Sequence, residues 1–378
     1  MSLFHRHLQH IFKQSKSVLN SWAKGNMATP TKLARMTKAI IGTHDSTFHC
    51  DDVTACYMLK QLDRFKNHEI IRTRDPSALD EAEIIVDVGG EFDAERLRLD
   101  HHQRSFNLTI KDFYPNMKTT NQDKPPRLSS AGLVYVIFGK QLIVTKLGLG
   151  TSYDELSEDK KAMIDAIYEK AYVEFMEEID AIDNGVEVAS GDNLVYNYHI
   201  NSGVSSRVGR LNPYGMTATP EARMAQFRKA MDMVGAELSE GIDFLGNIWW
   251  PKRQQFRNFV LKRKEFDASG QLVLIESDHL ISWKSALLEL EEELGIVGEL
   301  KYIIFFEKQW RATAVPVSLK SFTSRVPLKE EWRGKRDEDL QQASGVPDAN
   351  FVHMSGFTGG AASLEGMKAM CRKSLGLE

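Results

Sequence analysis

Four short segments of this 378-residue chain gather side chains that commonly bind metal ions. They are residues 44–52, Asp87, residues 100–102, and the pair Asp180 and Asp183. The first holds two His and three Asp in nine positions after the apolar run KAII, and the next two close the runs IIV and RLRL. A carboxylate at the end of a buried strand needs a cation or several donors to stay ionised. Mixed imidazole and carboxylate side chains suit Mn²⁺, Fe²⁺, Co²⁺ or Zn²⁺ better than Ca²⁺.

Each of these residues also has an ordinary structural explanation. An Asp after a strand is most often a turn former or a helix N-cap, and two Asp three positions apart on a helix usually lie on its exposed face. Four such clusters, each at the end of a predicted strand or helix, favour a metal site instead. Two ions about 3.5–4 Å apart need a shared carboxylate and several further ligands, and the four segments contain enough of them.

The elements around these segments predict how they are brought together. Apolar runs and helical spacing predict strands at 38–44, 69–75, 83–90 and 96–102, and helices at 51–62, 129–143 and 158–183. Strands that alternate with helices indicate a parallel sheet with crossover helices. Ligands bind beyond the carboxyl ends of such strands, so we expect the clusters to meet there.

The chain changes character after residue 200. Residues 201–213 are rich in Gly, Ser and Pro, residues 219–266 have helical spacing, and 271–277 and 302–317 are strand-like. We therefore predict an α/β protein, in which a parallel-sheet domain is joined by long helices to a smaller C-terminal α/β domain.

Composition limits the partners of the protein. The formal net charge is −4, and beyond residue 44 the chain has 41 basic and 52 acidic residues, so it is no broad polycation that coats duplex DNA. No apolar run reaches the roughly 18 residues that suggest a membrane span. The three cysteines, Cys50, Cys56 and Cys371, form neither a disulfide framework nor a CxxC motif, which fits a reducing compartment.

The first 37 residues form a basic leader. Residues 1–44 contain seven Lys or Arg and no Asp or Glu, and apolar residues recur in the leader at close to helical spacing. This composition is typical of a mitochondrial transit peptide, which predicts the mitochondrial matrix, and a basic tail is the alternative. Met27 could start a second form, located in the nucleus or the cytosol.

Several motifs resemble a known family. Residues 100–102 (DHH) after a strand, the VD pair upstream and the His- and Asp-rich first segment resemble the DHH phosphoesterase superfamily of exonucleases, oligoribonucleases and manganese pyrophosphatases. More narrowly, five motifs in order resemble the Myg family within it: THDSTFHCDD, DVGGEFD…LDHHQRSF, EEIDAIDNGV, SFTSRVPLKEEWRG and FVHMSGFTGG. The resemblance begins at about residue 38 and runs to the end. It implies a DHH-like metal-binding catalytic domain at 38–200, a linker and connecting helix at 201–240, and a substrate-binding domain at 241–378.

The resemblance also implies two divalent metal ions, with manganese expected and magnesium, zinc or cobalt as alternatives. One ion would be held by His44, His49 and Asp87, and the other by Asp51, Asp87, His101 and Asp183. Asp183 is preferred to Asp180 because DNG at 183–185 resembles the DTG of the superfamily. His49 stands where the superfamily usually has an Asp, which adds a nitrogen ligand. Asp52, Asp100 and His102 would support the ligands or contact the substrate phosphate.

The C-terminal segment GFTGG, residues 356–360, is the expected phosphate site. Gly359 and Gly360 could offer backbone N–H groups without side-chain obstruction, and Arg325, Arg333 and His353 could add charge. An ordinary Gly-rich turn is the alternative.

Two further segments are weaker candidates for substrate contact. The stretch 249–266 interleaves aromatic and basic residues, which could bind single-stranded nucleic acid. We prefer a helix with solvated basic residues there. Arg207 and Arg210 could also reach a substrate phosphate, and a plain linker is an equal alternative.

The resemblance implies a two-metal 3′–5′ exoribonuclease that acts on single-stranded RNA in RNA processing and releases nucleoside 5′-monophosphates. One alternative is a phosphatase on short oligonucleotides, nucleotides or pyrophosphate. The other is a non-catalytic RNA-binding protein. We expect no membrane partner, and the oligomeric state stays open, with a homodimer as one candidate.

Overall fold

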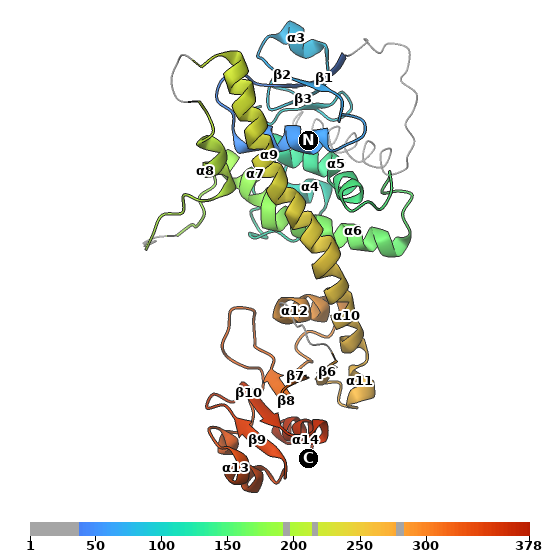
Figure 1. Cartoon of the computed structure of the whole chain (residues 1–378), viewed down its shortest axis with the longest axis vertical. Coiled ribbons are helices and arrows are strands. Elements are labelled where there is room, and N and C mark those ends of the chain that lie inside the picture. Colours follow the sequence, from blue (N-terminus) through green and yellow to red (C-terminus); the bar gives the residue numbers. More distant parts are fainter. Residues whose placement is uncertain (1–37, 192–196, 214–217, 277–282) are drawn as a thin grey trace, which may run out of the picture. The chain divides into compact units, whose positions relative to one another are not determined.

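The computed structural model describes residues 38–191, 197–213, 218–276 and 283–378 (Figure 1). The chain divides into two compact units, one ending at Ile248 and the other running from Trp249 to Glu378. The predicted class, an α/β protein with a smaller second α/β unit, is confirmed. The leader predicted at residues 1–37 lies outside the described residues. Among the described helices, none combines the length and the apolar character that a membrane crossing requires.

The first unit is built on a five-stranded sheet with the order β2-β1-β3-β5-β4. Its strands are β1 (Lys38–Thr43), β2 (Glu69–Arg72), β3 (Ala82–Val86), β4 (Phe92–Asp93) and β5 (Arg98–Leu99). All neighbouring strands pair in parallel except β4, one of the two edge strands, which is antiparallel to β5. The predicted parallel sheet is therefore present, and β1, β3 and β5 end beside one another.

Helices complete the first unit. They are α2 (Cys50–Lys60), α3 (Pro76–Asp80), α4 (Ile110–Phe113), α5 (Ser130–Lys146), α6 (Glu158–Ala171), α7 (Glu177–Asp183), α8 (Val204–Gly209) and α9 (Pro220–Phe244). The helix α2 packs against both α5 and α9, and its middle is fully buried at Val53 and Ala55. It is therefore a central helix, and its first turn carries Asp51 and Asp52.

The helix predicted at 158–183 is interrupted by one π-helical segment. The α-helical backbone of α6 changes to a π-helix at η1 (Tyr172–Met176) and returns to the α form in α7. The helix ends at Asp183, and Gly185 follows in the left-handed region with φ 66°. The stop signal predicted at Asn184-Gly185 is thus confirmed, since glycine adopts this conformation without steric cost.

The long helical stretch predicted at 219–266 consists of four segments. After α9 come the π-helical η2 (Leu245–Trp249), α10 (Trp250–Leu261) and α11 (Arg263–Phe266). The division between the two units falls inside this stretch. Residues 201–240, expected as a linker and connecting helix, contain α8 and most of α9 and belong to the first unit.

The second unit contains a mixed five-stranded sheet with the order β6-β7-β8-β10-β9. Its elements are β6 (Leu272–Ile275), α12 (Trp283–Leu294), β7 (Tyr302–Glu307), β8 (Gln309–Ala314), η3 (Glu330–Trp332), α13 (Asp337–Ser344), β9 (Ala349–Val352), β10 (Thr358–Ala361) and α14 (Leu364–Ser374). The strand-like stretch 302–317 is an antiparallel hairpin, because the chain turns at Lys308 with φ 61°. Separate apolar clusters pack around Tyr302 and around Ile303, which neighbour each other on β7.

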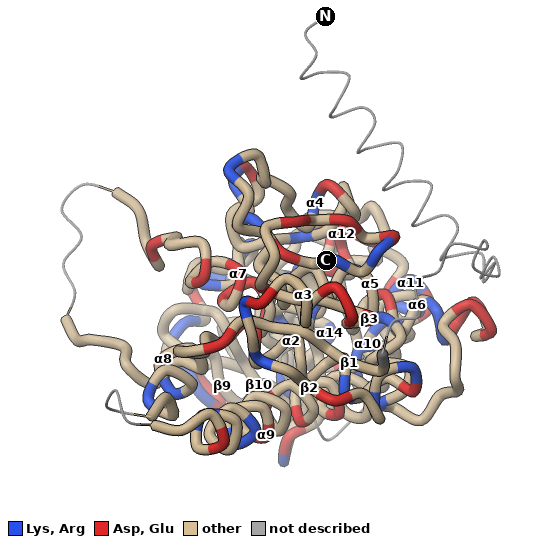
Figure 2. Tube along the Cα trace, turned by 90° about the horizontal axis from the view of Figure 1, so that it is seen from above, with Lys and Arg blue, Asp and Glu red and all other residues tan. Residues whose placement is uncertain are grey.

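Charged residues of both signs are interspersed along the described chain. Figure 2 shows basic and acidic segments following one another along the tube. This distribution agrees with the composition, which excludes a broad basic surface.

Candidate metal centre

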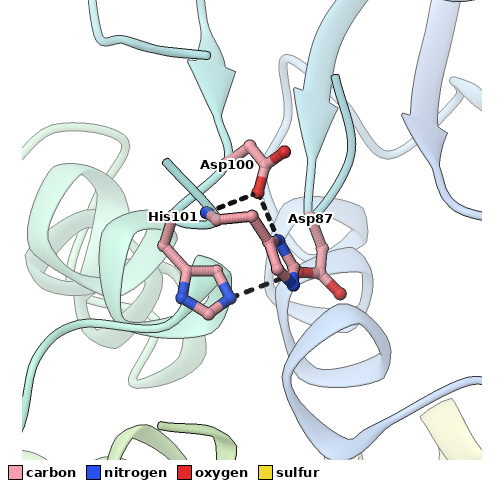
Figure 3. Close-up of side chains that lie close together, drawn as sticks. Asp87, Asp100 and His101 are labelled. Atoms are coloured by element: carbon pink, nitrogen blue, oxygen red, sulfur yellow. Dashed lines mark hydrogen bonds and ion pairs between the residues drawn. The ribbon is translucent and has the colours of Figure 1, made fainter. Parts of the chain in front are cut away.

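The carboxyl ends of three parallel strands bring the predicted ligands together. His44, Asp87 and Asp100 are each the first residue after a strand: β1, β3 and β5, respectively. Because β3 lies between β1 and β5 in the sheet, the three residues leave it side by side. Figure 3 shows Asp87, Asp100 and His101 converging beyond these strand ends.

Asp87 lies between two imidazoles. Its Oδ2 is 3.2 Å from Nε2 of His44, and its Oδ1 is 3.4 Å from Nε2 of His101. Its backbone has φ 59°, in the left-handed region that few residues other than Gly, Asn and Asp adopt. Backbone conformations of this kind gather at functional sites. A carboxylate with one oxygen toward each imidazole is arranged as a bridging ligand would be.

The first turn of α2 supplies two more carboxylates. His49 is the N-cap residue, and its backbone N–H donates to Oδ1 of Asp52 at 2.7 Å. This capping interaction holds Asp52 in place. Asp51 and Asp52 are both fully buried, and Oδ2 of Asp52 is 3.3 Å from Nε2 of His44. The N-terminal end of α2 favours negative charge at these two positions.

The end of α7 adds Asp183 to the cluster. Its Oδ2 is 3.1 Å from Nε2 of His101, and the same imidazole nitrogen lies 4.0 Å from Oδ2 of Asp51. His101 is therefore surrounded by carboxylates from three segments that are far apart in the sequence.

Among the described residues, ligand-capable atoms form four overlapping groups, within each of which the atoms lie no more than 4.8 Å apart. The groups are Asp87 with Asp100, His101 and His102; His44 with His49 and Asp87; His49 with Asp51 and Asp183; and Asp51 with Asp52 and Asp87. The structure thus brings together every predicted ligand and all three residues predicted to support them. Asp87 belongs to three of the four groups.

Several buried atoms of the cluster have no hydrogen-bond partner within the described part of the chain. They are both carboxylate oxygens of Asp51, Oδ2 of Asp52, and Nε2 of His44 and of His101. An unsatisfied buried polar atom costs about 1–3 kcal/mol, and more if it is charged. Metal ions held by these atoms would remove that cost, so the residues fit divalent metal ions.

The imidazole of His44 is oriented for such a role. Its Nδ1 lies 2.7 Å from the backbone carbonyl oxygen of Asp45, a position from which Nδ1–H can donate. Nε2 then carries the lone pair that can bind a metal ion, and this nitrogen lies next to the carboxylates of Asp52 and Asp87. A hydrogen bond that fixes the tautomer in this way is the usual arrangement of metal-binding histidines.

The buried cluster contains more carboxylates than positively charged groups, and this affects their pKa values. Burial, together with the neighbouring carboxylates of Asp87, Asp183 and Asp52, raises the pKa of Asp51 well above its usual value. Burial also raises the pKa of Asp52, to about 7, although the charge of His44 opposes this shift. For Asp87 burial acts in the same direction, but the adjacent imidazoles of His101 and His44 outweigh it and lower the pKa. Cations between these carboxylates would relieve their repulsion.

Asp180, the alternative to Asp183, has other partners. Its Oδ1 accepts hydrogen bonds from the backbone N–H and the hydroxyl of Ser129, and its Oδ2 accepts one from the hydroxyl of Tyr172. Asp180 is in none of the four ligand groups among the described residues, whereas Asp183 is. The geometry therefore supports Asp183 as the ligand.

Arg325, predicted to bind phosphate in the second unit, has other partners in the structure. The guanidinium of Arg325 makes two hydrogen bonds to Glu291, at 2.6 and 2.7 Å, and one to the carbonyl of Leu300. This pairing argues against the phosphate role expected for Arg325. Arg333 is partly exposed and donates to the carbonyl of Leu328, and His353 is exposed. The phosphate-binding roles of Arg333 and His353 remain predictions.

Gly359 and Gly360 do not lie in a loop. Both belong to β10, which pairs with β8 on one side and β9 on the other, so their backbone groups take part in the sheet. This pairing argues against a phosphate cradle at the two glycines. Close packing accounts for them instead, because a Cβ on Gly360 would lie 2.5 Å from the ring of Phe351.

Three of the basic residues of 249–266 pair with acidic ones. Arg253 and Arg257 both contact Glu293, and Arg263 contacts Glu299. This pairing supports the preferred interpretation as an ordinary helix. In the segment 201–213, Arg207 pairs with Glu237, and Arg210 donates to a backbone carbonyl.

Two residues near the cluster were missed by sequence reasoning. The hydroxyl of Ser130 donates to Oδ1 of Asp87 at 3.3 Å, and the Ser-Ser pair that opens the helix at 129–143 could have indicated it. The side-chain amide of Asn212 accepts from the N–H of Phe48 and donates to its carbonyl oxygen, which holds the loop before α2. The sequence offered no signal for Asn212, because it lies in a stretch interpreted as a linker.

The chain is similar to known proteins over most of its length. The MYG1 exonuclease family model, described as an uncharacterised protein family (UPF0160), matches residues 40–375. A MYG1 protein of Caenorhabditis elegans is 43% identical over 342 residues, which cover 89% of this chain and 95% of that protein. The MYG1 exonucleases of Bos taurus and Homo sapiens are each 40% identical, covering 89% of this chain and 84% and 85% of those proteins.

Proposed function

The chain belongs to the MYG1 exonuclease family, and from this premise we propose that it is a metal-dependent 3′–5′ exoribonuclease. It would hydrolyse single-stranded RNA to nucleoside 5′-monophosphates in RNA processing. Membership of the family supports a nuclease-type hydrolase. The observation that carries the finer proposal is the buried cluster in which Asp87 lies between His44 and His101 and several ligand atoms lack partners.

The proposed ligands divide into two sets that share Asp87. One ion would be held by His44, His49 and Asp87, and the other by Asp51, Asp87, His101 and Asp183, as the resemblance to the DHH superfamily implies. When bound by these residues, divalent ions would lower the pKa of a coordinated water to near neutral and would neutralise charge on the phosphate. The mixture of imidazole and carboxylate favours Mn²⁺, with magnesium, zinc or cobalt as alternatives.

The chain's own residues orient this site. Asp100 accepts hydrogen bonds from Nδ1 of His102 at 2.7 Å and from the N–H of Gly90 at 2.6 Å. The side chain of His102 is 62% exposed, so it is an accessible imidazole beside Asp87. The hydrogen bond to Asp100 raises the pKa of His102, which favours the charged form. A positively charged His102 would attract the substrate phosphate.

The test is cleavage of a 5′-labelled single-stranded RNA with Mn²⁺. The wild type should give a ladder of labelled products that shortens from the 3′ end. Asp87→Ala should lower the rate by about 10³-fold, because losing a shared ligand removes several kcal/mol of transition-state stabilisation. The matched control is Asp63→Ala, which removes an exposed carboxylate paired with Lys66 and should cleave as the wild type does.

Other results would select the alternatives. Immediate release of a labelled mononucleotide would contradict the 3′–5′ direction. Intact RNA together with Mn²⁺-dependent hydrolysis of pyrophosphate or dinucleotides would indicate the phosphatase. RNA that is bound but not cleaved, by the wild type and Asp87→Ala alike, would indicate the non-catalytic RNA-binding protein.

Location and assembly are further proposals. We propose that residues 1–37 direct the protein to the mitochondrial matrix and that a form starting at Met27 stays in the nucleus or the cytosol. Imaging of both forms with a C-terminal fluorescent tag tests this, and identical distributions would contradict it. Sedimentation would show whether the protein is a monomer or a homodimer.

A further inference from the structure

Asp180 is a fully buried carboxylate one turn before the proposed ligand Asp183 on α7. Its Oδ1 accepts from the backbone N–H of Ser129 at 2.9 Å and from the Ser129 hydroxyl at 2.7 Å. Its Oδ2 accepts from the Tyr172 hydroxyl at 2.9 Å. Both oxygens are therefore engaged by groups outside the ligand cluster.

The partner of Asp180 begins the helix that reaches Asp87. Ser129 is the N-cap of α5, where its side chain accepts from the N–H of Gly132. The next residue, Ser130, is also fully buried, and its hydroxyl donates to Oδ1 of Asp87 at 3.3 Å. Two consecutive residues thus connect Asp180 with the proposed bridging ligand.

The two helices approach closely at this point. A Cβ on Gly132, in the first turn of α5, would lie 2.3 Å from Oδ1 of Asp180. That distance is shorter than any ordinary contact, so the position needs glycine for the carboxylate to reach Ser129. The first turn of α5 and the last two turns of α7 are joined through this one side chain.

We propose that Asp180 is a positioning residue that locks α7 to the start of α5 and thereby places two parts of the metal centre together. On α7 it keeps Asp183 beside His101. On α5 it keeps the Ser130 hydroxyl on Asp87. The inference rests on the proposed function, because it assigns a purpose to Asp180 only if the cluster binds metal.

The test measures Mn²⁺ binding by calorimetry without RNA, and then kcat and KM for RNA cleavage. Asp180→Ala should weaken Mn²⁺ binding by about 10–100-fold, the usual effect of removing a group that orients a metal ligand. It should lower kcat, and KM for RNA should change by no more than about twofold, since the substrate does not touch Asp180.

A conservative variant separates positioning from direct ligation. In Asp180→Asn, the amide oxygen can still accept from Ser129 and the amide N–H can donate to the Tyr172 oxygen. We expect its Mn²⁺ affinity to stay within about threefold of the wild type, while Asp183→Asn loses at least about tenfold. An equal loss in both variants would overturn the proposal, because Asp180 would then behave as a ligand.

Ser130→Ala keeps the test decisive if Asp180→Ala does not fold. This change leaves the bonds of Asp180 intact and removes only the hydroxyl that reaches Asp87. It should weaken Mn²⁺ binding by about threefold or more, and unchanged affinity would overturn the proposal.

Absence of Mn²⁺ binding by the wild type would refute the proposed function itself. Normal binding by both the wild type and a folded Asp180→Ala would refute only the positioning role.

Discussion

His101 is the residue at which protons and metal ions compete most directly. Burial alone would lower its pKa, but the adjacent carboxylates of Asp183 and Asp87 outweigh burial and raise it to about 9. The metal-free protein therefore carries a proton on this imidazole at neutral pH. The carboxylates that hold the proton in place are those proposed to share a metal ion with His101.

We predict that Mn²⁺ affinity rises with pH up to about 9, because the His101 proton must leave before Nε2 binds metal. Each proton released makes the affinity increase about tenfold per pH unit. Calorimetry in two buffers of different ionisation enthalpy would measure both the affinity and the number of protons released. An affinity that stays constant between about pH 6.5 and 8.5 would contradict the prediction.

At the scale of elements, the position of α2 depends on its contact with α9. The Tyr57 hydroxyl on α2 lies 2.7 Å from the hydroxyl of Ser239 on α9, at hydrogen-bond distance. A Cβ on Gly235 of α9 would lie 2.1 Å from the Tyr57 ring. The two helices can approach this closely only because residue 235 is glycine, and α2 carries Asp51 and Asp52.

Gly235→Ala should destabilise the first unit by about 1–3 kcal/mol, the usual cost of overpacking. The control is Gly241→Ala in the same helix, where a Cβ meets nothing within 4 Å. That change should stabilise the protein by up to about 1 kcal/mol, because alanine is the better helix former. Urea unfolding measures both variants. Equal effects would show that the close approach to Tyr57 is unimportant.

In the second unit, Glu291 at the end of α12 ties several segments together. Its buried carboxylate accepts two hydrogen bonds from Arg325, one from the N–H of Leu300 and one from the N–H of Gly298. Glu291→Gln should cost about 3 kcal/mol of unfolding free energy, because it leaves the buried guanidinium without a countercharge. Chemical denaturation measures this loss.

The control for Glu291 is an exposed pair in the same unit. Glu307→Gln removes the partner of Arg311 on the surface, and exposed pairs contribute about 0–1 kcal/mol. Similar losses in the two variants would contradict the structural role assigned to Arg325 and would reopen its role as a phosphate ligand.

At the scale of the whole molecule, the candidate metal residues all belong to the unit that ends at Ile248. Mn²⁺ at about 100 times its dissociation constant should therefore stabilise that unit by about 2.7 kcal/mol and leave the second unit unchanged. Calorimetry would show the shift. Hydrogen exchange should slow in peptides from 38–191 and stay the same in peptides from 283–378. Equal protection of both sets would contradict the location of the site.

Much of the fold could be predicted because its signals are local. The apolar runs of β1 and β3 and the helical spacing of α5 and α6 are patterns within one element, and each of these elements largely buries the apolar residues of its pattern. Their alternation implied the parallel sheet. The same logic placed His44, Asp87 and Asp100 at neighbouring strand ends, since the carboxyl ends of parallel strands share one edge.

The tertiary structure decided what depends on partners far away in the chain. Asp180 meets Ser129 across 51 positions, and Arg325 meets Glu291 across 34. No local pattern encodes either pair, so the sequence offered no partner for Asp180, which stayed an alternative ligand, and could not separate a phosphate site at Arg325 from a buried ion pair. Gly359 and Gly360 were misplaced for the same reason, because strand pairing on both sides is a property of the assembled sheet. By itself, the sequence determined which residue types lie at strand ends, and only folding decided which buried charges face one another.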